Sequence, residues 1–159
     1  AIENPKLLTE IAHTIGRQSV VAVLDVRKKI GLFSKGYEVC THNGKTIHNL
    51  APSTLAKTLQ DAGAGEVVLN SMDRDGEMKG YDLMLAQQIR GVLSVPMTVL
   101  GGAGSLSDIG ALIRACGVVG AGVGSLFVFK GKYRAVLINY PTTEQRDEIF
   151  RDTNVQQYS

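Results

Sequence analysis

The sequence predicts an α/β domain built around parallel β-strands, and three observations support this. Short apolar runs alternate along the chain with segments whose apolar residues recur at helical spacing. Strands separated by helices pair in parallel through right-handed crossovers. Each of the four apolar runs leads into Asp or Gly, residue types expected where a parallel sheet meets its ligand. The chain of 159 residues is long enough for one compact domain, which we expect to span 1–159.

The chain is predicted to begin with a helix followed by a strand. Asn4 suits the N-cap position and Pro5 the first helical position, and the apolar spacing continues until Gly16 ends the helix. Residues 19–26 (SVVAVLDV) form a short, β-branched apolar run, which is typical of a strand buried on both faces in a parallel sheet. This predicted strand carries Asp25 near its end.

A β-hairpin is predicted after the first strand. Asn43 and Gly44 separate two extended segments within residues 37–47. An Asn-Gly pair between such segments is the strongest short-range hairpin signal in the chain. We expect this hairpin to be an excursion from a loop.

Helices and strands alternate over the rest of the chain. Asp, Ser and Gly stand at the boundaries of these segments, where helix caps and stops require them. The predicted helices cover residues 52–62, 82–93, 105–113 and 142–152, with a short helix after 125, and the predicted strands cover 66–71, 96–100 and 118–123.

Two aspartates are candidate catalytic residues. Asp25 follows five apolar residues, so its carboxylate is expected to be partly removed from water, which suits general acid or base catalysis. A carboxylate that caps a helix or bridges a loop fits the residue type equally well. Asp73 is followed by Arg74 and Asp75. It is either a catalytic carboxylate with an internal ion pair or part of a charged turn closed by Gly76.

Two glycine-rich segments, GGAGS at 101–105 and GVGS at 122–125, each lie between a strand and a helix. They offer unblocked backbone N–H groups and helix N-termini, which suit a phosphate group. Such glycines can also serve only to make tight turns, but two segments on consecutive strands favour phosphate binding. The candidate phosphate-binding residues are Gly101, Gly102, Gly104, Gly124 and Ser125.

Composition argues against several classes of function. Seventeen Lys and Arg against fifteen Asp and Glu give a net charge of +2 spread along the chain, so we expect neither nucleic-acid binding nor a membrane anchor. Cys40 and Cys116 lack CxxC spacing and indicate a reduced, cytoplasmic protein rather than a disulfide framework or a zinc site. The three histidines have no second ligand at metal spacing, so we expect no metal and no cofactor.

Taken in order, six segments resemble the cyclase subunit of imidazole glycerol phosphate synthase, a (βα)8 (TIM-type) barrel of histidine biosynthesis with lyase or cyclase activity. The segments are AIENP, VVAVLDV, EVCTHNGK, GAGEVVLNSMDRDGEMKGYDL, VPMTVLGGAGS and GVGSLFVFKGKYRAVLINYP. They match the second part of that barrel over about residues 1–140, which leaves 141–159 as a C-terminal extension. TVLGGAGS and GSLFVFKGKYRAVLINYP look most like the branch associated with bacterial surface-polysaccharide amidotransfer.

The resemblance implies a reaction. In the family, ammonia from a glutaminase partner passes through the barrel and reacts with a phosphorylated nucleotide, while two aspartates act as general acid and base. Asp25 matches the aspartate at the end of the fifth strand. The other aspartate ends a first strand that this chain does not supply.

The resemblance also assigns the strand-end loops. The family's loop after the sixth strand matches residues 73–77, including Asp73, with Glu77 in place of threonine. Leu100 stands where the histidine-pathway enzymes usually carry a serine. The family's phosphate-binding loops match Gly101, Gly102, Gly124 and Ser125.

Four predicted strands are half of the eight that such a barrel needs. Bare sheet edges and an uncovered apolar face favour association, and a second copy of the chain would close the barrel as a homodimer. The dimer would place two Asp25 carboxylates at one mouth, together with two phosphate sites. The alternatives are a non-catalytic phosphate-binding or assembly module derived from the enzyme, or a piece of a longer gene product.

Overall fold

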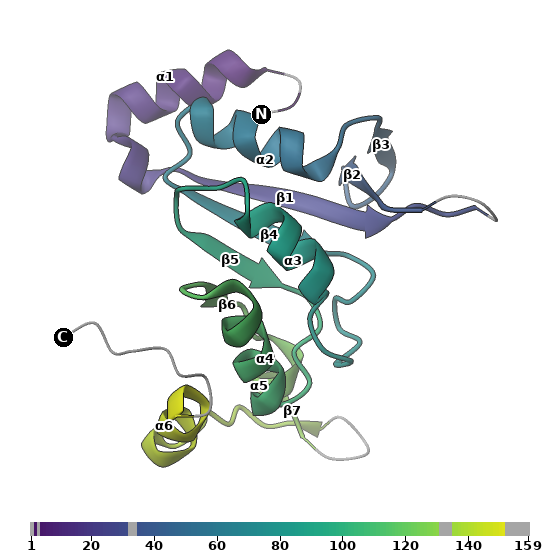
Figure 1. Ribbon diagram of the computed structural model, residues 1–159, viewed down its shortest axis with the longest axis vertical. Helices are drawn as coiled ribbons and strands as arrows, with labels where there is room; N and C mark the ends of the chain where they lie inside the picture. Colours follow the sequence, from purple (N-terminus) through teal and green to yellow (C-terminus); the bar gives the residue numbers. More distant parts are fainter. Residues whose placement is uncertain (1, 3, 32–34, 131–134, 152–159) are drawn as a thin grey trace.

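The computed structural model describes residues 2, 4–31, 35–130 and 135–151. The α-helices are α1 (Pro5–Ile15), α2 (Pro52–Asp61), α3 (Leu83–Arg90), α4 (Leu106–Cys116), α5 (Ser125–Val128) and α6 (Thr143–Arg151), with a 3-10 helix over Arg17–Ser19. The strands are β1 (Val21–Lys28), β2 (Tyr37–Thr41), β3 (Thr46–His48), β4 (Glu66–Ser71), β5 (Met97–Leu100), β6 (Gly120–Ala121), β7 (Phe129–Lys130) and β8 (Ala135–Val136). Figure 1 shows their arrangement.

The larger sheet has six strands in the order β3-β2-β1-β4-β5-β6. Strands β1, β4, β5 and β6 are parallel, and the chain passes through helix α2, α3 or α4 between each of them and the next. The predicted α/β class with a parallel sheet is therefore confirmed. Each parallel strand lies within two residues of its predicted limits.

The hairpin after β1 belongs to the large sheet, which corrects the expectation that it is only an excursion from a loop. Strand β2 pairs antiparallel with Asp25 to Lys28 of β1. Strand β1 continues two residues beyond its predicted end, and the backbone groups added there need hydrogen-bond partners. The hairpin turn contains Asn43 and Gly44 at positive φ, as the sequence predicts.

Side chains cap three helices at the positions that the sequence indicates. Asn4 accepts a hydrogen bond from the backbone N–H of Leu7 at the start of α1. Asp82 accepts one from the N–H of Leu85 at the start of α3, and Ser105 caps α4. These bonds satisfy N–H groups that have no partner inside their own helix.

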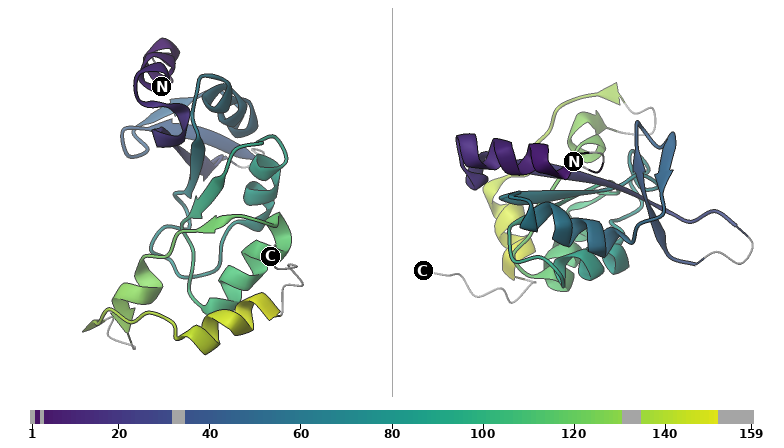
Figure 2. Two further views of the ribbon diagram at one scale, coloured as in Figure 1. Left: turned by 90° about the vertical axis from the view of Figure 1, so that its left-hand side faces the viewer. Right: turned by 90° about the horizontal axis from the view of Figure 1, so that it is seen from above.

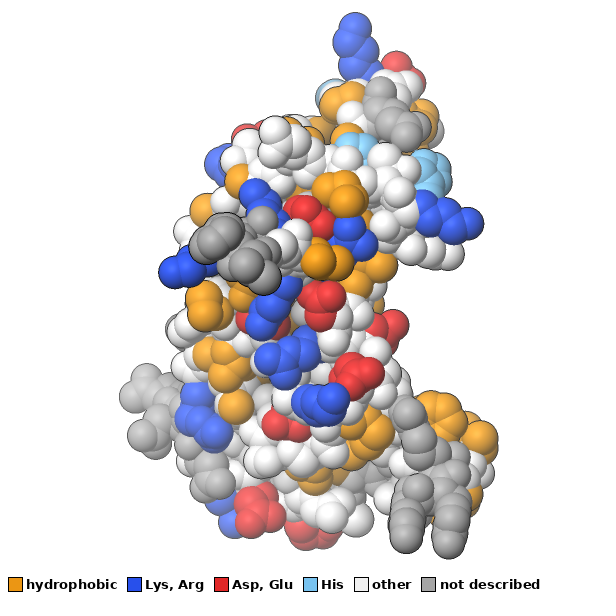
Figure 3. All heavy atoms as spheres, turned by 90° about the vertical axis from the view of Figure 1, so that its right-hand side faces the viewer, with side chains coloured by type: hydrophobic (Ala, Val, Ile, Leu, Met, Phe, Trp, Pro, Cys, Tyr) orange, Lys and Arg blue, Asp and Glu red, His pale blue; other side chains and the backbone are white. Residues whose placement is uncertain are grey.

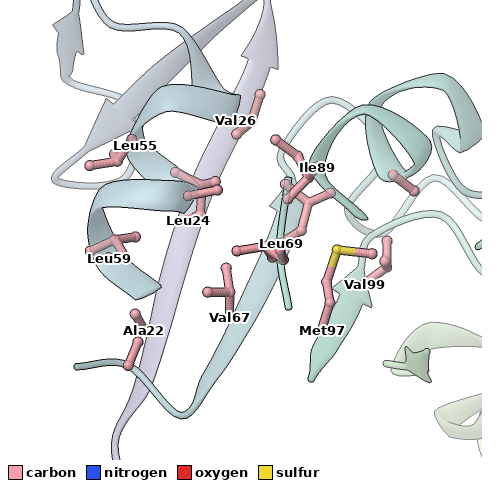
Figure 4. Close-up of a cluster of buried hydrophobic side chains, with 14 of the residues drawn as sticks. Ala22, Leu24, Val26, Leu55, Leu59, Val67, Leu69, Ile89, Met97 and Val99 are labelled. Atoms are coloured by element: carbon pink, nitrogen blue, oxygen red, sulfur yellow. The ribbon is translucent and has the colours of Figure 1, made fainter. Parts of the chain in front are cut away.

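The core lies between the parallel strands and helices α2, α3 and α4. Helices α2 and α3 lie on the same side of the sheet (Figure 1 and Figure 2), and alternate strand residues pack beneath them (Figure 4). Each fully buried aliphatic side chain contributes roughly 2 kcal/mol of hydrophobic stabilisation. The largest of them include Leu24, Val26, Val39, Val67, Leu69, Met97 and Val99 from the strands and Leu85, Ile89 and Leu112 from the helices.

The opposite face of β1 is open to solvent. Val21 and Val23 point away from the helices and are 52% and 60% exposed. Among the described residues no strand pairs with the outer edge of Val21 to Leu24, because β2 covers only Asp25 to Lys28. The expectation of two bare edges is therefore corrected: the hairpin covers half of one edge, and β6 forms the other.

After β6 the chain forms α5, a small β7–β8 hairpin and α6. Helices α5 and α6 confirm the short helix after 125 and the helix expected over 142–152, whereas the β7–β8 pairing is not predicted. Residues 152–159, the end of the expected extension, lie outside the described residues. No helix in the described part of the chain is long and apolar enough to cross a membrane.

Candidate site at the strand ends

One row of residues crosses the parallel strands near their C-terminal ends. Asp25 is in register with Asn70, and Asn70 with Leu100. Gly122 continues the row beyond β6, because Val99 is in register with Ala121. All of these residues alternate with side chains that point toward the helices, so they lie on the open face. Three strand spacings of about 4.8 Å separate Asp25 from Gly122 by roughly 14 Å.

Asn70 orients the carboxylate of Asp25. Its side-chain Nδ2 donates a hydrogen bond to Asp25 Oδ1 at 2.9 Å. Asp25 is half-buried, so one carboxylate oxygen has a fixed partner while the side chain keeps access to solvent. A carboxylate held in this way can exchange a proton with a ligand bound over the sheet.

Asp73 holds the end of β1 through its carboxylate. Its Oδ2 accepts a hydrogen bond from the backbone N–H of Lys28 at 2.6 Å. Arg74 donates to the carbonyl oxygen of Lys79 at 3.0 Å, which closes the loop on itself, and Gly76 has a φ of 72°. Asp73 is exposed and follows the C-terminal end of β4. The parallel strands point toward one side of the molecule in Figure 1, and acidic and basic side chains are mixed over that side in Figure 3.

A small cavity of about 90 Å³ lies beside the loops that follow β5 and β6. Four of the five candidate phosphate-binding residues line it, so the structure brings these positions together from two separate loops. Its small size suits one compact anion rather than a whole nucleotide. The lining residues are Asp75, Gly76, Met78, Gly101, Gly102, Ala103, Gly122, Gly124 and Ser125.

The glycines that line the cavity differ in whether packing leaves room for a side chain. A Cβ atom on Gly101 would lie 2.5 Å from the carbonyl oxygen of Ser71, and one on Gly102 would overlap the carbonyl oxygen of Gly80. Close packing of two loops therefore demands glycine at both positions. A Cβ atom on Gly124 would meet no atom within 4 Å. Packing does not explain Gly124, and its open backbone leaves room for a ligand.

The fifth candidate, Gly104, has another partner. Its backbone N–H donates to Asp108 Oδ2 at 3.0 Å, and the N–H of Ser105 donates to the same oxygen at 2.9 Å. The bond from Ser105 belongs to a capping box at the start of α4, and the bond from Gly104 adds to it. The carboxylate of Asp108 therefore already occupies this helix N-terminus.

Tyr37 ties the hairpin to the start of α3. Its hydroxyl donates to Asp82 Oδ1 at 2.9 Å, and Lys28 Nζ lies 3.7 Å from Asp82 Oδ2. Burial and the hydrogen bond to Asp82 raise the pKa of Tyr37 to about 12. This network fixes the hairpin beside the strand that carries Asp25.

Two polar residues that support the site, Asn70 and Asp108, are not among the residues predicted from the sequence. Asn70 lies within an apolar strand, and its pairing with Asp25 emerges only from the parallel register. Asp108 had a usable signal, because Ser105 and Asp108 have the spacing of a capping box. Within the described residues, no group of three or more His, Cys, Asp or Glu side chains could hold a metal ion.

Comparisons with known proteins identify one matching protein family and several similar proteins. Residues 1–134 match the model of a family described as histidine biosynthesis protein. A protein of Leptospira interrogans, provisionally named imidazole glycerol phosphate synthase subunit HisF, is 50% identical over 150 residues, which are 94% of this chain and 58% of that protein. The imidazole glycerol phosphate synthase subunit HisF of Chloroherpeton thalassium (strain ATCC 35110 / GB-78) is 41% identical over 109 residues, 69% of this chain and 42% of that protein. The chain thus spans about half the length of these relatives.

Proposed function

Because the chain belongs to the histidine biosynthesis family that includes the HisF subunits of imidazole glycerol phosphate synthase, we propose that it binds a phosphorylated small molecule at its strand ends. The phosphate occupies the cavity between the loops after β5 and β6. The backbone N–H groups of Gly102, Gly124 and Ser125 donate hydrogen bonds to the phosphate oxygens, and this binding requires no particular side chain.

One observation carries this proposal: the cavity and the Asp25 carboxylate lie on the same row across the sheet. The roughly 14 Å between Asp25 and Gly122 lets one ligand place its phosphate in the cavity and a reacting group at the carboxylate. Asn70 fixes the carboxylate at its end of the row.

The family relationship supports a cyclase or lyase reaction at this row. Asp25 acts as the general acid or base, and ammonia supplied by a glutaminase subunit is the second reactant. Asp73 is a second candidate catalytic residue, and its hydrogen bond to Lys28 N positions it at the strand-end face.

The four parallel strands form half of a (βα)8 barrel, and a second copy of the chain completes it. The exposed Val21 and Val23 and the half-covered edge of β1 need a partner surface. In a closed dimer, β6 of each copy pairs with β1 of the other. The shared mouth then holds two Asp25 carboxylates.

Titration of the full chain with inorganic phosphate, followed by NMR amide shifts, tests the binding proposal. Shifts should concentrate at Gly102, Gly124 and Ser125, and Gly124→Ala should weaken binding without unfolding the protein, since its Cβ meets no protein atom. An absence of shifts at these amides would refute it. Turnover of an aminoimidazole nucleotide with ammonium, compared with Asp25→Asn, then tests catalysis.

A non-catalytic phosphate-binding or assembly module is the second candidate. The bond from Lys28 N to Asp73 favours it, because that carboxylate already has a structural task. If the dimeric protein binds phosphate but does not turn over the nucleotide, the non-catalytic function is favoured.

A further inference from the structure

Side chains of β5 occupy the space above β6. A Cβ atom on Gly120 would overlap Thr98 Oγ1, and one on Gly122 would overlap Leu100 Cδ2. Gly120 is in register with Thr98, and Gly122 follows Ala121, which is in register with Val99. The open face of β6 therefore consists of backbone, and Leu100 leans across it.

Leu100 separates the two polar parts of the strand-end row. Asn70 and Asp25 lie on one side of it, and Gly122, which lines the cavity, lies on the other. The Tyr81 hydroxyl donates to the carbonyl oxygen of Gly122 at 2.9 Å, so the backbone beneath Leu100 is held in place. Leu100 is half-buried and keeps an apolar surface toward the open face.

We propose that Leu100 is a specificity-determining residue that selects ligands with carbon surface next to the phosphate. This rests on the proposed phosphate site. A ligand that spans from the cavity to Asp25 must pass over Leu100, which can neither donate nor accept a hydrogen bond. A hydroxyl group placed there loses its water partners without replacement, whereas a ring or alkyl carbon gains burial. The preferred class is a phosphate whose neighbouring group presents ring or alkyl carbon to Leu100 rather than a hydroxyl, and a nucleotide meets this requirement when the carbon face of its sugar lies over Leu100.

The test compares phenyl phosphate with glycerol 3-phosphate as probes, both titrated into the full chain by NMR. The wild type should bind phenyl phosphate about 5- to 10-fold more tightly, as expected for burial of roughly 50 Å² of ring surface. Leu100→Ser should bring the ratio close to one while leaving the affinity for inorganic phosphate within about twofold. Leu100→Met, which keeps an apolar side chain of similar size, should retain the preference.

Inorganic phosphate separates failure of the inference from failure of the proposed site. If phosphate binds at the cavity but Leu100→Ser leaves the probe ratio unchanged, the specificity proposal alone is overturned. If the wild type does not bind phosphate at the cavity, both proposals fall. Dispersion of the amide spectrum reports folding, and Leu100→Ala provides a second variant in which the ratio should also fall.

Discussion

Gly102 and Gly124 both line the cavity, yet their surroundings predict opposite effects of an added methyl group. At Gly102 the methyl would overlap the backbone of the loop after β4, whereas at Gly124 it would enter open space. Close packing therefore requires glycine at position 102, whereas at position 124 only the proposed ligand would compete with a methyl group for space. The sequence alone shows only that both are glycine.

Gly102→Ala should lower the free energy of unfolding by about 2 kcal/mol more than Gly117→Ala does. Both glycines have positive φ, 116° and 71°, but a Cβ on Gly117 would meet no atom within 4 Å. The comparison therefore separates the contact with Gly80 from the strain of positive φ itself. Urea unfolding measures both variants, and equal losses would contradict the close-packing explanation.

Tyr81 should make stability depend on alkaline pH. Burial raises its pKa to about 12, and its hydroxyl donates to Gly122. Because the folded-state pKa exceeds the unfolded value near 10, its contribution is fully present below pH 10 and is lost as the pH rises through about 12. The loss approaches about 1.4 kcal/mol per pH unit in that window. Chemical unfolding at several pH values should show a weaker dependence in Tyr81→Phe; an identical slope would argue against this role.

At the scale of elements, helix α4 and the cavity compete for negative charge. The Asp108 carboxylate caps α4 and accepts a hydrogen bond from the N–H of Gly104, which directly follows the cavity-lining Ala103. It stabilises the helix through the N–H groups of Gly104 and Ser105. The same charge opposes a phosphate in the cavity.

Asp108→Asn should tighten the binding of inorganic phosphate by about threefold or more, because it removes a negative charge and keeps an acceptor oxygen for the cap. Asp61→Asn is the matched control, since it makes the same change in net charge at the end of α2. NMR titration compares the affinities. A similar change in both variants would show that only the total charge matters.

Local sequence patterns predict some features of the helices and strands but not others. The parallel strands and the caps at Asn4, Asp82 and Ser105 were predictable, because apolar runs and capping residues act within a few positions. The pairing of β2 with β1 was not, because it depends on contacts between segments distant in sequence. The Asn70–Asp25 hydrogen bond could not be predicted for the same reason, because it joins two strands that are distant in sequence.

At the scale of the whole molecule, the exposed face of β1 is the feature that most needs a partner. Val23 lies on that face, and Val21 to Leu24 form an edge that no described strand covers. Parallel strands are almost always covered on both faces in folded proteins. The surface is therefore suited to burial in an assembly.

Val23→Lys should dissociate the proposed dimer, because a closed barrel would bury the introduced charge without a counterion. Met84→Lys is the control, because Met84 is 71% exposed on the outer surface of α3. Size-exclusion chromatography with light scattering should give a smaller mass for Val23→Lys than for Met84→Lys. Equal masses would place the interface elsewhere.

Sedimentation equilibrium of the full chain at micromolar concentration tests the half-barrel account most directly. A dimer in which two sets of four parallel strands close one barrel has a mass of twice 17.0 kDa, and we expect this mass. A stable species of 17.0 kDa would contradict it.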